Sequence, residues 1–126
     1  MTHSPGHQKW PDHHVTEHAV GGRMTVRVNG ELVADSSSVT RVDEDGAPPR
    51  FYFPRNDVKV DKLHRSATTT ECPYKGTARY FDLDAGGASL HDAVWSYEQP
   101  YDEHRGLAGR LAFYDDKNPD IEVRAV

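Results

Sequence analysis

Cysteine is nearly absent from this chain, and long apolar runs are missing altogether. Cys72 is the only cysteine among 126 residues, which excludes an internal disulfide and favours a reducing compartment. The apolar runs are only a few residues long, whereas a membrane-spanning helix needs roughly 20. The N-terminal stretch also lacks the apolar core of a secretory signal. We therefore expect a cytoplasmic protein that does not associate with a membrane.

Blocks of basic residues and metal-ligand motifs are missing too. The 15 Lys and Arg are outnumbered by 20 Asp and Glu, the formal net charge is −5, and no basic stripe is present, so we expect no nucleic-acid partner. His14 and His18 are four residues apart but have no third ligand, and Cys72 has no Cys-x-x-Cys partner. The order Lys75-Gly76-Thr77 is wrong for a phosphate-binding loop. We expect no bound metal or cofactor.

Residues 1–22 differ in composition from the rest of the chain. They hold five of the eight histidines, two prolines and few aliphatic residues, which favours an extended His/Pro-rich N-terminal arm. From residue 23 onward no linker or repeat divides the chain, and its length suits one domain. We expect a single domain over residues 23–126.

Short segments of alternating apolar residues dominate this domain. Met24, Val26 and Val28 alternate with polar residues and are followed by Asn29-Gly30, the strongest short signal of a β-hairpin. Residues 56–63 suit one helical turn, and no sustained helical period is present. The pattern predicts a mainly β, compact antiparallel sandwich- or barrel-like domain with at most one or two short helical turns. Strands are expected at 24–28, 31–35, 39–42, 50–53, 77–83, 93–97, 107–114 and 121–126.

The densest unusual segment begins at Cys72. Pro73 forces Cys72 to be extended and Gly76 permits a positive φ, so a bend should bring the Cys72 thiol near Lys75. A nearby ammonium favours the thiolate, which would make Cys72 a nucleophile activated by Lys75. The base would be His64 or His91, with Asp92 orienting one of the two. The alternative, which the sequence favours, is that both histidines are solvent-facing loop residues. The alternative for Cys72, which the sequence also favours, is that it is a small buried packing residue, since free cysteine is among the most buried residue types.

Aromatic and cationic residues together indicate a ligand pocket. Adjacent aromatics point to opposite faces of a strand, so one member of each pair can line a groove beside Arg50, Arg55 and Lys75. Such a lining suits a small anionic or aromatic ligand. The residues that we expect to line this pocket are Arg50, Tyr52, Arg55, Tyr74, Gly76 and Trp95.

Several of these motifs resemble a known family, the domain of unknown function 427. The stretches that carry the resemblance are 28–36, 49–58, 72–80, 93–97 with Pro100, and 109–114, and the Cys-Pro-Tyr-Lys-Gly core at residues 72–76 is the most specific. Residues 10–13 are similar to an N-terminal extension of bacterial members. The resemblance implies a β-tent-like fold, shared with R-specific methionine sulfoxide reductases. Many β-tent proteins bind zinc through cysteine pairs, which this chain lacks, so neither zinc nor reductase chemistry is implied.

Three functions remain open at this point. The leading hypothesis is a domain that binds a small molecule in a pocket formed by the bend at residues 72–76 and the Arg and aromatic residues. A thiol-dependent enzyme with Cys72 as nucleophile is the alternative, and a protein-interaction module using exposed strand edges is the third. A homodimer also stays open.

Overall fold

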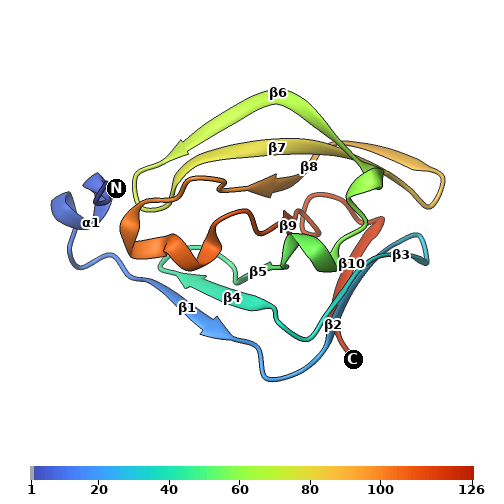
Figure 1. Cartoon of the computed structure of the whole chain (residues 1–126), viewed down its shortest axis with the longest axis horizontal. Helices are drawn as coiled ribbons and strands as arrows, with labels where there is room; N and C mark the ends of the chain where they lie inside the picture. Colours follow the sequence, from blue (N-terminus) through green and yellow to red (C-terminus); the bar gives the residue numbers. More distant parts are fainter. Residues whose placement is uncertain (1) are drawn as a thin grey trace.

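Antiparallel strands make up most of the computed structural model, which describes residues 2–126 (Figure 1). Its helical segments are all short: α1 (Pro5–Lys9) and the 3₁₀ turns η1 (Arg55–Asp57), η2 (Val60–Lys62) and η3 (Asp102–Leu107). The strands are β1 (Val15–Ala19), β2 (Met24–Val28), β3 (Glu31–Ser36), β4 (Thr40–Glu44), β5 (Arg50–Tyr52), β6 (Leu63–Cys72), β7 (Gly76–Ala85), β8 (Ala88–Ser96), β9 (Ala112–Phe113) and β10 (Ile121–Ala125).

These strands form three sheets, with the orders β1-β4-β5, β10-β2-β3 and β6-β7-β8-β9. Every pairing is antiparallel. In Figure 1 the long strands β6 and β7 arch over one side of the molecule, and β1 and β4 lie on the opposite side. Within residues 2–126 no sheet closes into a barrel. The predicted mainly β, antiparallel, single-domain fold is confirmed.

The β2–β3 hairpin forms where the sequence predicts it. Asn29 and Gly30 both have positive φ, 48° and 88°, as a two-residue turn matching the strand twist requires. The alternation directs Val26 and Val28 into the core, where both are fully buried. The aromatic strand β5 lies at a sheet edge, as its flanking prolines predict.

Other expected elements are wrong or were missed. The predicted strand at 107–114 is reduced to β9, because η3 ends at Leu107 and Gly109 turns the chain with φ 73°. The one helical turn expected at residues 56–63 is present as two short 3₁₀ turns, η1 and η2, rather than as one turn. The polar strand β6 was not expected, and β1 extends the sheets into the region interpreted as the arm.

Two apolar clusters fill the interior. The first joins β2, β3, β7, β8 and β10 and is mainly aliphatic. The second is richer in aromatics and lies where the sheet containing β7 and β8 meets the sheet containing β4 and β5. Its buried members are Val15, Val42, Tyr52, Ala78, Tyr80, Trp95, Tyr97, Leu107 and Ala112. This second cluster forms one wall of the site described below.

Candidate functional site

A cavity of about 140 Å³ opens against the aromatic cluster. Four of the residues predicted to serve a site line it: Arg50 and Tyr52 from β5, Trp95 from β8, and Lys75 from the turn between β6 and β7. The remaining lining residues are Val42, Glu44, Ala47, Pro48, Tyr97 and Tyr114. These four residues were named from the sequence, but the acidic residue of the lining and two of its three tyrosines were not.

The Arg50 guanidinium is held between aromatic rings and a carboxylate. Its central carbon lies 5.3 Å from the Trp95 ring centroid and 5.2 Å from that of Tyr114. Its two terminal nitrogens donate to the carboxylate oxygens of Asp116 at 3.0 and 3.2 Å. This fork geometry fixes the planar cation at the cavity wall.

Lys75 is the second cation of the cavity and is 8% exposed. Its ammonium donates to Glu44 at 2.6 Å, and the other oxygen of Glu44 contacts His13 Nε2 at 3.0 Å. Burial opposes ionisation of Glu44, but the hydrogen bonds from Lys75 and His13 outweigh it and lower the Glu44 pKa. Lys75 therefore faces an ionised carboxylate rather than the Cys72 thiol.

Three phenols of the cavity stay neutral at ordinary pH, because burial raises the pKa values of Tyr52, Tyr97 and Tyr114. The Tyr52 hydroxyl accepts a hydrogen bond from Trp95 Nε1 at 3.1 Å. The Tyr114 hydroxyl lies 3.3 Å from that of Tyr80. The Tyr97 side chain is mostly buried, but its hydroxyl has no hydrogen-bond partner among residues 2–126 and reaches solvent, since no fully buried polar side-chain atom of these residues lacks a partner. A neutral phenol in this setting can donate to a ligand.

Three of the predicted pocket residues do not line this cavity. Arg55 donates to the Gly109 carbonyl at 2.9 Å and to Ser96 Oγ at 3.3 Å. Gly76 has φ 124° and packs against the backbone at residues 99–101, so it shapes the turn that carries Lys75. Tyr74 faces the N-terminal arm, where the His13 ring stacks on it at 4.3 Å.

The structure does not bring the proposed bases to the thiol. Cys72 is half-buried, packs against the aromatic cluster, and is paired with Gly76 at the end of β6. His64 is paired with Asp82 in the sheet, and its Nε2 contacts Asp84 at 3.0 Å. Since strands rise about 3.3 Å per residue, the two pairs are about 20 Å apart along β7.

His91 lies near that same distant end of β7. Its Nδ1 contacts Asp82 at 2.8 Å and its Nε2 contacts Asp92 at 3.3 Å. One ligand atom from each of these three side chains lies within 4.8 Å of the others, and all three are at least partly exposed. Of the two candidate bases, Asp92 therefore contacts His91, near the end of β7 that lies away from Cys72.

The N-terminal arm packs on the bend that follows Cys72. The Pro73 carbonyl accepts from Ser4 Oγ and from the Gly6 backbone N–H, both at 2.7 Å. His7 Nε2 lies 2.9 Å from His104 Nε2, and His104 Nδ1 lies 2.7 Å from Glu17. Burial, followed by the neighbouring His104, lowers the pKa of His7.

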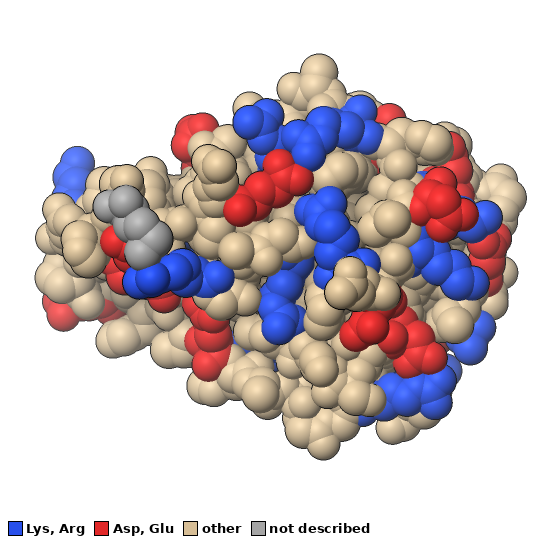
Figure 2. All heavy atoms as spheres, in the orientation of Figure 1, with Lys and Arg blue, Asp and Glu red and all other residues tan. Residues whose placement is uncertain are grey.

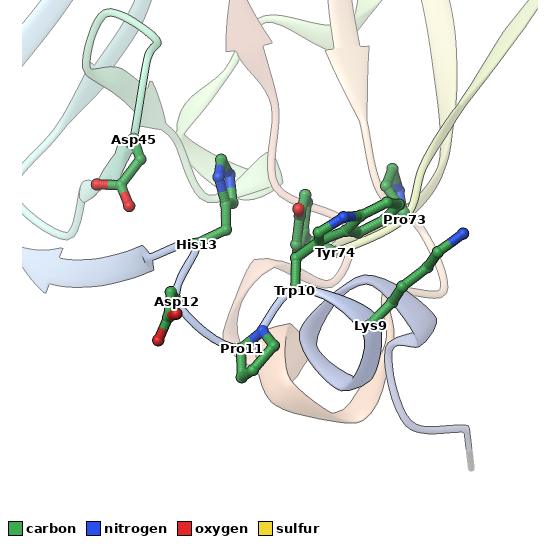
Figure 3. A pocket seen from close by; sticks show the side chains of 8 residues that line it. All are labelled: Lys9, Trp10, Pro11, Asp12, His13, Asp45, Pro73 and Tyr74. Carbon is green, nitrogen blue, oxygen red and sulfur yellow. The ribbon is translucent and has the colours of Figure 1, made fainter.

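Docking of the arm leaves a second, wider hollow of about 680 Å³ on the surface (Figure 3). It is lined by Lys9, Trp10, Pro11, Asp12, His13, Asp45, Pro73 and Tyr74. Most of these residues belong to the arm itself, so the hollow exists only while the arm is docked. On the face shown in Figure 2, acidic groups lie beside basic ones over much of the surface.

Residues that were not predicted from the sequence include Tyr97 and Glu44, which line the cavity, and His104, which contacts the N-terminal arm. Alternation along β8 placed Tyr97 on the same face as Trp95, and this was the available signal for Tyr97. The sequence carries no signal for Glu44 or His104, because each contacts a residue at least 31 positions away in the chain.

These features define a small antiparallel β domain with an aromatic, cation-lined cavity and a docked N-terminal arm. A family model described as "Domain of unknown function (DUF427)" matches residues 17–124. The chain therefore belongs to this family, as its motifs indicated. Comparison with curated proteins found no match. No helix among the described residues is both long and apolar enough to cross a membrane.

Proposed function

We propose that this domain binds a small organic anion, of only a few non-hydrogen atoms, in the cavity beside Arg50 and Tyr97. The observation that carries the proposal is the Arg50 guanidinium fixed at the cavity wall, with the Tyr97 hydroxyl in the same lining free to donate because it has no partner among residues 2–126. An anion beside Arg50 can accept a hydrogen bond from this hydroxyl. Tyr52, whose oxygen already accepts from Trp95, retains its own proton to donate.

Charge and size support a small carboxylate. Arg50 and Lys75 contribute two cations to the lining and Glu44 one anion. Asp116, the partner of Arg50, is 46% exposed, so a ligand carboxylate can compete with it for the guanidinium. The volume of about 140 Å³ is below the range of roughly 300–1,000 Å³ typical of drug-sized ligands.

Thiol catalysis is not proposed, because neither His64 nor His91 lies near Cys72. A cytoplasmic location is part of the proposal and is supported by the single free cysteine.

A panel of small carboxylates, from formate to succinate, tests the proposal by ligand-observed NMR and titration calorimetry. We expect at least one to bind the wild-type protein, and Arg50→Gln to weaken it by about tenfold or more, as loss of a charged hydrogen-bond pair predicts. Arg41→Gln is the matched control, because Arg41 is exposed on the neighbouring strand β4 and pairs only with Asp43. Absence of binding across the panel, or equal weakening by both variants, would contradict the proposal.

A further inference from the structure

The wider hollow, which is lined mainly by residues of the N-terminal arm, contains the aromatic side chains of Trp10 and Tyr74. Trp10 is 47% exposed, unusually so for a large apolar side chain in this protein. Its ring centroid lies 6.3 Å from that of Tyr74, with the planes at 52°. Pro11 and Pro73 extend the apolar wall (Figure 3). The result is a concave surface on which the Trp10 ring is exposed, while the His13 ring stacks on one face of Tyr74.

The carboxylates of Asp12 and Asp45 line the same hollow. Asp45 accepts the His14 backbone N–H at 2.8 Å, which is the largest cause of its lowered pKa, so it is ionised at neutral pH. Asp12 has no salt-bridge or hydrogen-bond partner in the part of the chain that is described. In Figure 3 both carboxylates lie on the side of His13 away from Lys9. Asp45 also contacts His14 Nδ1 at 3.1 Å, so the carboxylate that is free of protein partners among the described residues, and can attract a cation, is Asp12.

The Lys9 ammonium lies over the Trp10 ring. Lys9 Nζ lies 4.8 Å from the ring centroid, within the distance of about 6 Å at which a cation is attracted to an aromatic face. Lys9 is exposed, and among residues 2–126 it has no carboxylate partner. Its ammonium is therefore held by the ring alone and can leave it at low cost.

We propose that the hollow lined by Trp10, Tyr74, Asp12 and Asp45 binds a small organic cation with an alkylammonium head, which displaces the Lys9 ammonium from the indole face. The aromatic faces attract the cation at short range, and the carboxylates supply the longer-range attraction. The volume of about 680 Å³ lies within the usual range for small-molecule sites. This ligand is a cation, whereas the ligand proposed for the inner cavity (the cavity of about 140 Å³ beside Arg50) is an anion. Binding experiments can therefore distinguish the two sites by the charge of the ligand.

Titration of the full chain with choline chloride tests this inference, with sodium chloride at matched concentration as the reference. The two tryptophan indole N–H signals in the NMR spectrum report on separate places, since Trp10 is exposed and Trp95 is buried. We expect choline to shift the Trp10 signal and to leave that of Trp95 in place. Trp10→Leu should abolish binding, and Asp45→Asn should weaken it several-fold. Because Trp10 and Asp45 are exposed, both variants should fold, which circular dichroism verifies.

The most informative variant removes the Lys9 ammonium, which competes with the ligand for the Trp10 ring. Lys9→Gln should tighten choline binding by about 3- to 30-fold, since a cation–aromatic contact contributes roughly 0.5–2 kcal/mol. Lys117→Gln is the matched control: Lys117 lies 4.5 Å from the Tyr114 ring, outside the hollow, so choline affinity should not change. Unchanged or weaker binding in Lys9→Gln, or choline binding that survives Trp10→Leu, would overturn the proposal.

The same head group also occurs on lipids, so phosphatidylcholine vesicles form a second arm of the experiment. Binding of free choline without sedimentation on vesicles supports a small-molecule site. Sedimentation on vesicles without binding of free choline would overturn it in favour of a lipid surface.

Discussion

Gly86 and Gly87 occupy one turn between β7 and β8 but face different surroundings. Both have positive φ, 55° and 75°. A Cβ on Gly86 would collide with the backbone carbonyl of Val28, whereas a Cβ on Gly87 would meet no atom within 4 Å. The same substitution therefore adds a clash at the first position and only backbone strain at the second.

We expect Gly86→Ala to lower the free energy of unfolding by about 2–4 kcal/mol and Gly87→Ala by about 1 kcal/mol. Urea denaturation of both variants measures the difference. Equal losses would mean that the turn moves away from β2 without cost.

Some residues that line the inner cavity could be predicted from the sequence and others could not. Arg50, Tyr52 and Trp95 were predictable because side chains alternate along a strand and these aromatics lie next to cations. Glu44 was not, because its role depends on meeting Lys75 across 31 positions of chain. Tyr74 was misplaced for the same reason: the arm covers it, and the sequence carries no signal for that contact.

At the scale of elements, the arm is held by close backbone packing rather than by its tryptophan. A Cβ on Gly6 would lie 2.6 Å from the Pro73 carbonyl oxygen and 2.7 Å from Tyr74 Cδ1. Any side chain at this position must push α1 away from the bend. The hollow that contains Trp10 depends on this contact.

Gly6→Ala should therefore release α1 and accelerate amide exchange in residues 5–10 by about tenfold or more, while exchange in β7 and β8 stays unchanged. Gly21→Ala is the control, because its Cβ would meet no atom within 4 Å. Arm exchange that is as slow in Gly6→Ala as in Gly21→Ala would show that the packing is looser than described.

Elements were predictable where one face is buried and the other is not. The β2–β3 hairpin follows from alternation and from Asn29-Gly30. The strand β6 was missed because its side chains are mostly exposed or half-buried and polar, so no apolar period marks it. The expected strand at 107–114 failed because apolar residues there fill the core from a 3₁₀ turn and a short bridge, not from an extended chain.

Across the whole molecule, ionised carboxylates connect segments that are distant in the chain. The hydrogen bond from Arg23 lowers the pKa of Asp35, and that from Arg50 lowers the pKa of Asp116. The pKa of Glu44 is also lowered, because the bonds from Lys75 and His13 outweigh its burial. In each case the unfolded chain binds the proton more tightly, so folding is favoured at pH values above the unfolded pKa and loses that contribution as pH falls.

The free energy of unfolding should therefore decrease as the pH falls from about 5 to about 3, through and below the ordinary values of 4.5 for Glu44 and 3.8 for Asp35 and Asp116. Urea denaturation at a series of pH values measures this. Glu44→Gln should flatten the dependence, because it removes a titrating group that joins the arm to the cavity. A stability that stays level down to pH 3 would contradict these pairings.

The most direct test of the central claim is the affinity of Tyr97→Phe for the carboxylate that binds the wild-type protein best. This change removes only the unpartnered hydroxyl of the inner cavity, and Tyr101→Phe, outside the cavity lining, is its control. We predict that Tyr97→Phe weakens binding by about 10- to 100-fold, the loss expected for a hydrogen bond to a charged group, while Tyr101→Phe binds like the wild type. Equal affinity in all three proteins would contradict the claim that the Tyr97 hydroxyl holds an anionic ligand.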